Sequence, residues 1–315
     1  MPIASDLAFL FPGQGSQSLG MLAELAAEQP LVEATFAEAS AACGLDLWSL
    51  SQAGPEVELN RTEATQPALL AAGVAVWRVW QSNPANPTPI WLAGHSLGEY
   101  TALVCAGALS LADAAKLVRE RGRLMQNAVP AGSGAMAAVL SSEDELIAAA
   151  CVEAAQGQVV APANFNSPSQ TVIAGDSAAV ERAIALLAER GVKKIVRLPV
   201  SVPSHCALMR DAALALRERM DALNWSLPTI PVLQNADVSP YYQIDEIKDA
   251  LVRQLYLPVR WLETMQALAQ VGITRYAECG PGRVLTSLVK RFDKTLDARA
   301  LGSPADLAQA QTDWS

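Results

Sequence analysis

The chain has 315 residues, of which 51% are hydrophobic and 17% charged, so it is long enough for a large core and more than one domain. The formal net charge of −9 argues against a nucleic-acid partner, because no basic stripe dominates. No run of about 18 apolar residues predicts a membrane span, and the first residues lack the features of a secretory signal. Five scattered cysteines without metal-ligand spacing fit reduced thiols in a cytoplasmic protein.

The N-terminal part alternates short apolar runs with amphipathic stretches. Residues 7–12 predict a buried strand that runs into the loop Gly13-Gln14-Gly15-Ser16-Gln17, and residues 90–93 predict a second strand after a proline-rich connector. Helices are expected over 21–42, 66–81, 99–106 and 110–128. This alternation is typical of an α/β fold with a parallel sheet.

The middle of the chain has a different pattern, β-α-β-β-α-β. Strands are expected over 135–140, 158–165, 170–174 and 192–198, and helices over 142–155 and 177–190. The first helix begins with a capping box at Ser142 and Glu145. The order predicts a ferredoxin-like small domain of residues 132–200, inserted into a core of residues 1–131 and 201–315. Alternatively, these strands belong to one continuous sheet.

The C-terminal part returns to the α/β pattern. Helices are expected over 208–223, 245–255 and 259–270, and strands over 231–235 and 273–278. The turn 279–282 opens a final helix, and the signals beyond Pro304 are weak.

The pentapeptide Gly94-His95-Ser96-Leu97-Gly98 lies between the strand at 90–93 and a helix. In a strand-turn-helix context, Gly-x-Ser-x-Gly holds a serine exposed at the helix N-terminus. Free backbone N–H groups and the helix dipole stabilise an oxyanion there. Ser96 is therefore a candidate nucleophile, although glycines and a serine also make ordinary turns.

Arg121 lies in the helix that opens with the capping box at Ser110 and Asp113. At about 100° per residue, Arg121 falls in the middle of the apolar face. A guanidinium buried there is costly unless it meets an anion, and its planar fork suits a carboxylate or phosphate. Both a ligand and a structural ion pair with a buried Asp or Glu satisfy that need.

Only two histidines are present, His95 and His205. His205 precedes a predicted helix, where the charged imidazolium is disfavoured, so the neutral ring can accept a proton from a serine. A buried or capping histidine is the alternative. His95 is expected to pack, and Cys206 is expected to point away from His205. No Asp or Glu stands out as a third member, so a carbonyl oxygen is expected to orient the ring.

Several motifs in this order together resemble the malonyl-CoA–acyl carrier protein transacylases of bacterial fatty-acid synthesis, nearly end to end. They are Phe11-Pro12-Gly13-Gln14-Gly15-Ser16-Gln17, Gly94-His95-Ser96-Leu97-Gly98-Glu99-Tyr100, Arg121-Gly122 with Met125-Gln126, Asn164-Phe165-Asn166-Ser167-Pro168, Val202-Pro203-Ser204-His205, Gln254-Leu255-Tyr256, Pro258-Val259-Arg260-Trp261 and Gly280-Pro281-Gly282.

The resemblance implies an α/β-hydrolase-like core and a role for each site residue. Ser96 would be acylated, His205 would be its base and Arg121 would bind the malonyl carboxylate. Backbone N–H groups of Gln14 and Leu97 would form the oxyanion hole. The main-chain carbonyl of Gln254 would orient His205. The residues expected to face the pantetheine arm are Asn164, Asn166 and Gln170.

The activity implied is ping-pong transfer of a malonyl group from malonyl-CoA to the phosphopantetheine thiol of acyl carrier protein. No cofactor, metal or membrane is implied, and a monomer is expected. Three other functions remain open: a serine hydrolase or thioesterase, a transacylase of another pathway, and a carrier-binding scaffold without catalysis.

Overall fold

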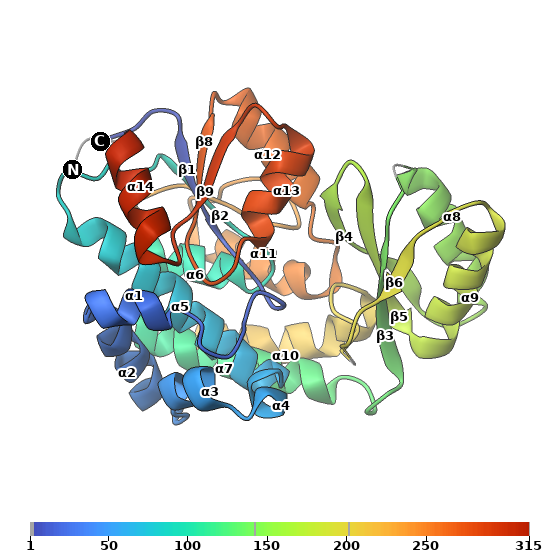
Figure 1. Cartoon of the computed structure of the whole chain (residues 1–315). Helices are drawn as coiled ribbons and strands as arrows, with labels where there is room; N and C mark the ends of the chain where they lie inside the picture. The colour runs from blue at the N-terminus through green and yellow to red at the C-terminus, as the bar shows by residue number, and fades with distance from the viewer. Residues whose placement is uncertain (1–2, 142, 201, 315) are drawn as a thin grey trace.

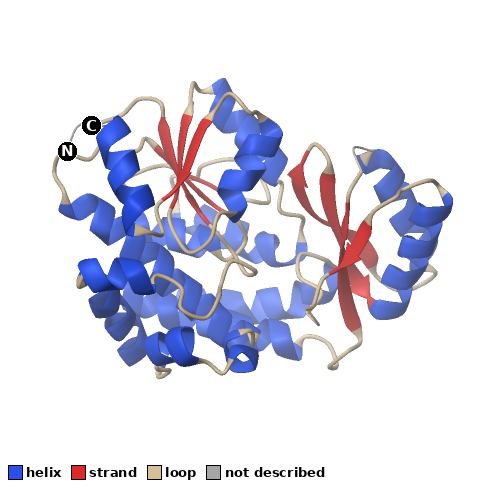
Figure 2. Cartoon of the chain, in the orientation of Figure 1, coloured by secondary structure: helices blue, strands red, loops and turns tan. Residues whose placement is uncertain are grey.

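The computed structural model describes residues 3–141, 143–200 and 202–314, which form two lobes, each built on its own β-sheet (Figures 1 and 2). Residues 134–197 supply every strand of the smaller sheet, and the larger sheet is built from the chain on both sides of that segment. The alternative of one continuous sheet is therefore wrong. In the described residues no helix has the length and apolar character needed to cross a membrane.

The larger sheet is parallel throughout and has the strand order β7-β2-β1-β8-β9. Its strands are β1 (Leu7–Phe11), β2 (Trp91–Gly94), β7 (Val232–Leu233), β8 (Arg275–Glu278) and β9 (Asp297–Ala300). Every residue of β1 is buried, as expected for the central strand of a sheet covered on both faces. The parallel sheet predicted from the sequence is confirmed. The edge strand β9 was not predicted, because it carries two charged residues.

Helices cover both faces of this sheet (Figure 2). They are α1 (Ala23–Glu28), α2 (Leu31–Cys43), α3 (Leu47–Ala53), α4 (Glu56–Leu59), α5 (Thr62–Ser82), α6 (Gly98–Cys105), α7 (Leu111–Asn127), η1 (Ala207–Met209), α10 (Arg210–Asp221), α11 (Ile244–Tyr256), α12 (Trp261–Gln270), α13 (Val284–Phe292) and α14 (Pro304–Trp314). The largest buried apolar cluster joins α2, α5 and α7 to the sheet.

Three predictions in the N-terminal part are wrong. The single helix expected over 21–42 is two helices, which separate at Gln29 and Pro30 because proline lacks the N–H that a continuous helix needs. The next long helix begins at Thr62 rather than Gln66 and continues through Pro67. The short helices α3 and α4 were not predicted, since each is too short to show a periodic pattern.

The smaller sheet is antiparallel, with the order β4-β5-β3-β6. Its elements are β3 (Gly134–Val139), α8 (Asp144–Ala155), β4 (Val160–Ser167), β5 (Gln170–Asp176), α9 (Ser177–Glu189) and β6 (Ile195–Arg197). The predicted β-α-β-β-α-β order is confirmed, although β6 is shorter than 192–198. The capping box expected at Ser142 lies outside the described residues.

The two faces of the smaller sheet serve different partners. One face packs on α8 and α9 through residues such as Val139, Ile147 and Val180. The opposite face, with Met136 and Ala138, packs with Cys206 of the large lobe. Main-chain hydrogen bonds also join the lobes, because Phe165 donates to the carbonyl of Val259 at 2.9 Å. The smaller sheet is thereby fixed beside the segment that contains His205.

Candidate active site

Ser96 lies on a sharp turn between β2 and α6, and its φ is 51°. The turn depends on two glycines. A Cβ on Gly98 would lie 1.9 Å from the carbonyl oxygen of Phe11, and one on Gly94 would lie 1.9 Å from the carbonyl carbon of Gly98. Only glycine fits at such distances. The strand, turn and helix predicted around Ser96 are therefore present.

The imidazole of His205 lies beside the Ser96 hydroxyl. His205 Nδ1 lies 2.7 Å from the carbonyl oxygen of Gln254, so Nδ1 carries the hydrogen and donates it. Nε2 is then free to accept from Ser96 Oγ, 2.8 Å away. No carboxylate orients the ring, as expected from the sequence.

His205 is held neutral mainly by its burial. Burial and the nearby Arg121 cation lower the pKa of His205 to about 3. The sequence attributed neutrality to a helix N-terminus, but a 3₁₀ turn separates His205 from α10. The neighbouring Cys206 thiol donates to the carbonyl of Pro203, and burial raises its pKa to about 11, so it is no thiolate.

Arg121 is almost fully buried on α7, whose predicted cap at Ser110 accepts from the N–H of Asp113. Its guanidinium donates to Gln66 Oε1 and Gln254 Oε1, each at 2.9 Å, and to Ser96 Oγ at 3.3 Å.

Within the described chain no carboxylate forms a salt bridge with Arg121, and its Nε has no hydrogen-bond partner. The structural ion pair is therefore wrong. A cation without an anion lies next to the serine hydroxyl.

Two main-chain N–H groups near Ser96 have no acceptor among the described residues, those of Gln14 and Leu97. Gly13 brings the Gln14 loop against the turn, since a Cβ on Gly13 would lie 2.5 Å from the carbonyl oxygen of His95. Unpaired N–H groups beside a nucleophile are what an oxyanion hole requires.

A cavity of about 120 Å³ lies between the lobes and contains these groups. Its lining residues are Gln14, His95, Ser96, Leu97, Arg121, Met125, Met136, Asn164, Leu198, Val200, Val202, Ser204 and His205. The cavity is narrow, with apolar side chains from both lobes beside the polar groups.

The three residues expected to face a pantetheine arm are placed differently from one another. Asn164 lines the cavity. Asn166 accepts a hydrogen bond from His95 Nε2 at 2.8 Å, and the His95 ring packs 5.4 Å from that of Trp261. Gln170 accepts from Arg291 at 3.4 Å, away from Ser96. Of the nine site residues predicted, Gln254, Asn166 and Gln170 do not line the cavity.

Three buried residues near Ser96 were missed, namely Gln66, Glu99 and Asn235. Gln66 has the same signal as Arg121, a polar side chain on a face of α5 that is otherwise apolar. Glu99 belongs to the motif around Ser96, and burial raises its pKa to about 8. Asn235 has no local signal.

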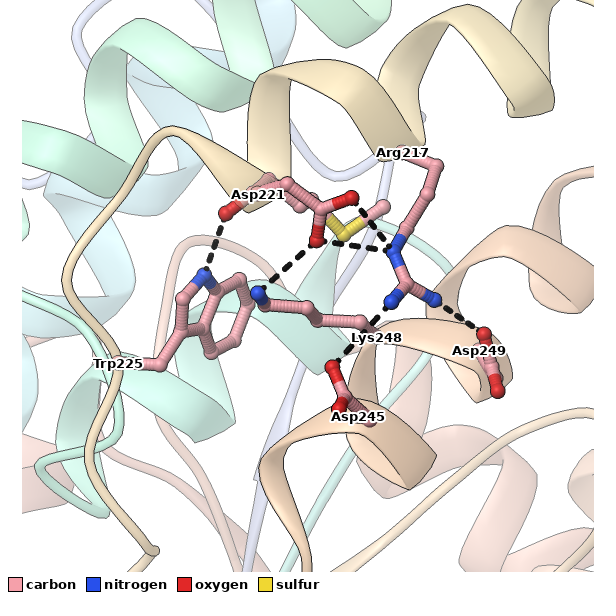
Figure 3. Close-up of polar contacts among 7 residues, drawn as sticks. Arg217, Asp221, Trp225, Asp245, Lys248 and Asp249 are labelled. Atoms are coloured by element: carbon pink, nitrogen blue, oxygen red, sulfur yellow. Dashed lines mark hydrogen bonds and ion pairs between the residues drawn. The ribbon is translucent and has the colours of Figure 1, made fainter.

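Charged side chains hold α10 against α11, the helix that carries Gln254 (Figure 3). Arg217 of α10 contacts Asp245, Asp249 and Asp221, and Lys248 of α11 donates to Asp221 at 3.0 Å. Because His205 lies just before α10, this cluster fixes the helix that supplies the carbonyl relative to the ring that receives it.

In the described part of the chain, no group of three or more His, Cys, Asp or Glu side chains could hold a metal ion.

Comparison with known proteins agrees with this geometry. The family model described as "Acyl transferase domain" matches residues 8–308. A relative from Salmonella typhimurium, named malonyl CoA-acyl carrier protein transacylase, is 56% identical over 98% of this chain and 99% of its own length. The crystal structure of malonyl-CoA:acyl carrier protein transacylase from Xanthomonas oryzae is 64% identical over 99% of both chains, with a TM-score of 0.98.

A further structure, a malonyl-transacylase in complex with its type II polyketide acyl-carrier protein, is 53% identical over 98% of this chain and 99% of that chain, with a TM-score of 0.96. The chain belongs to the acyl transferase family.

Proposed function

We propose that this protein transfers a malonyl group from malonyl-CoA to the phosphopantetheine thiol of acyl carrier protein, supplying fatty-acid synthesis. The observation that carries the proposal is Arg121, a buried cation without an anion, 3.3 Å from the Ser96 hydroxyl. An acyl group bound at Ser96 must then present a negative charge to Arg121, and the terminal carboxylate of malonate does so. The names of the relatives support the same reaction.

Ser96 is the nucleophile and His205 its base. As Ser96 Oγ attacks the thioester carbonyl, its proton passes to His205 Nε2. The N–H groups of Gln14 and Leu97 stabilise the oxyanion. The C–S bond then breaks, His205 protonates the departing CoA sulfur, and the malonyl group stays on Ser96. In the second half, His205 takes the proton of the carrier thiol, whose sulfur attacks the acyl-serine, and returns it to Ser96.

Gln254 orients His205 through its main-chain carbonyl, and Asn164 contacts the pantetheine arm from the small lobe. Asn166 and Gln170 support that side of the cavity. Acyl carrier protein as the acceptor is supported by the related complex. We propose that the reaction needs no cofactor, and that the chain acts as a monomer in the cytoplasm, where its five free cysteines stay reduced.

We further assign the larger lobe, residues 1–131 and 201–315, to the α/β-hydrolase-like type, and residues 132–200 to the ferredoxin-like type. The first assignment is supported by a serine turn after a parallel strand. The second is supported by an antiparallel sheet of β-α-β-β-α-β order with both helices on one face.

The test is to mix the protein with malonyl-CoA, stop the reaction with acid and locate the malonyl group by mass spectrometry. The group should be on Ser96, and adding acyl carrier protein should move it to the carrier thiol. A malonyl-enzyme that releases free malonate rapidly without a thiol acceptor would instead identify a thioesterase. Absence of any label on Ser96 would leave a carrier-binding scaffold.

A further inference from the structure

The backbone of Ser96 is in the left-handed region, which a residue with a side chain keeps only where its surroundings hold it there. The side chain of Asn235 supplies two hydrogen bonds to this turn. Its Oδ1 accepts from the N–H of Ser96 at 2.7 Å, and its Nδ2 donates to the carbonyl of Gly94 at 2.7 Å. Asn235 is fully buried, so water does not compete for either bond.

The position of Asn235 explains why an amide side chain is needed there. Strands β2 and β7 pair in parallel up to Ala93 and Leu233. Beyond that pair the first strand turns sharply at Ser96, so its main chain no longer faces the neighbouring strand. An asparagine side chain offers the same C=O and N–H groups as a peptide unit. Asn235 thereby continues the ladder across the turn.

Asn235 is in turn fixed through its own main chain. Its N–H donates to Glu99 Oε2 at 2.7 Å, and its carbonyl accepts from the N–H of Arg260 at 3.2 Å. Glu99 is fully buried and lies in the first turn of α6, the helix that follows Ser96. The Ser96 turn, the end of β7 and the start of α6 therefore form one hydrogen-bonded unit.

We propose that Asn235 is a positioning residue, which aims the Ser96 hydroxyl at His205 and is itself held by Glu99. The inference rests on the proposed function in that Ser96 is taken as the nucleophile. Asn235 occupies the Ser96 N–H and leaves the Leu97 N–H without an acceptor, beside the reacting carbonyl. Because Arg121 comes from α7 and does not depend on this unit, loss of Asn235 should slow acylation without weakening binding of the malonyl carboxylate.

The experiment compares Asn235→Ala with Asn86→Ala, a buried asparagine that donates to the carbonyl of Trp80, outside the site. For folded Asn235→Ala, kcat for malonyl transfer should fall at least about tenfold, while KM for malonyl-CoA stays within about threefold. Asn86→Ala reports how far losing a buried amide alone lowers Tm and kcat. A kcat for Asn235→Ala within about threefold of the Asn86→Ala value, or a loss confined to KM, overturns the proposal.

Two further measurements keep the test decisive. If Asn235→Ala does not fold, Asn235→Asp, which has the same shape, replaces it at alkaline pH, where a carboxylate cannot donate to the Gly94 carbonyl. The same drop in kcat is expected, and an unchanged kcat overturns the proposal. Acetylation of Ser96 by p-nitrophenyl acetate is measured in parallel. If the parent protein reacts with this ester but not with malonyl-CoA, the proposed function fails, and the Asn235 comparison is decided with the ester.

Discussion

Arg121 Nη2 lies 3.3 Å from Ser96 Oγ, so a buried cation touches the proposed nucleophile. Two glutamine side chains and no carboxylate complete the hydrogen bonds of the guanidinium in the described structure. Burial lowers the pKa of Arg121, yet an arginine stays charged in proteins. The site therefore has an unmet requirement for an anion, and most of the predictions below depend on the groups that meet at this point.

Replacing Arg121 with alanine should abolish malonyl transfer while sparing or raising acetyl transfer, because only the malonyl group has a carboxylate for the cation. We expect kcat/KM for malonyl-CoA to fall at least about a hundredfold, as for loss of a charged hydrogen-bonded pair. The matched control is Arg123→Ala, since Arg123 lies on the exposed side of α7 and pairs with Glu120. Equal losses for malonyl and acetyl groups would exclude the carboxylate-binding role.

The rate of Ser96 acylation should be nearly constant from about pH 8 down to about pH 5. His205 has a pKa lowered to about 3, so the ring remains neutral and able to accept a proton throughout that range. A histidine with an ordinary pKa near 6.5 would lose roughly thirtyfold in rate by pH 5. Single-turnover formation of the malonyl-enzyme measures this directly. An inflection near pH 6.5 would show that His205 is not held neutral by burial.

Glu99 should make the folded protein less stable as the pH rises. Its pKa is raised from 4.5 to about 8 by burial, so between these values the native state holds a proton that the unfolded chain has released. The stabilisation is complete below pH 4.5 and is lost as the pH rises through 8, by at most about 1.4 kcal/mol per pH unit.

Glu99→Gln should therefore flatten the decline in the free energy of unfolding between about pH 5 and 8, measured by urea denaturation. The control is Glu145→Gln, an exposed position on α8. Parallel curves for the parent protein and Glu99→Gln would argue against a protonated Glu99.

Arg217→Ala should lower the free energy of unfolding by about 1 kcal/mol, because Arg217 contacts three aspartates that join α10 to α11 (Figure 3). Its side chain is 27% exposed, so added salt should reduce the difference between the variant and the parent. Arg219→Ala is the comparison, since Arg219 is more exposed and has one contact, with Glu120 at 3.3 Å. Equal effects of the two substitutions would assign no special role to the cluster.

Local patterns in the sequence were sufficient for the parallel sheet, the β-α-β-β-α-β order of the small lobe, the turn at Ser96 and the inward direction of Arg121. Each of these depends on residues a few positions apart, through a strand period, a helix period or a pair of glycines. The same patterns failed where a helix was interrupted at Pro30, and where a charged edge strand, β9, owed its existence to pairing with β8.

The sequence by itself thus determined which residue types stand at the turn, on the helix and before η1. Only the tertiary structure decided which of them meet. Asn235 lies 139 positions from Ser96, and Gln254 lies 133 positions from Arg121, so no local period relates them. The low pKa of His205 and the lack of an anion for Arg121 are likewise decided by the tertiary structure, because burial and the set of neighbours are properties of the packed lobes.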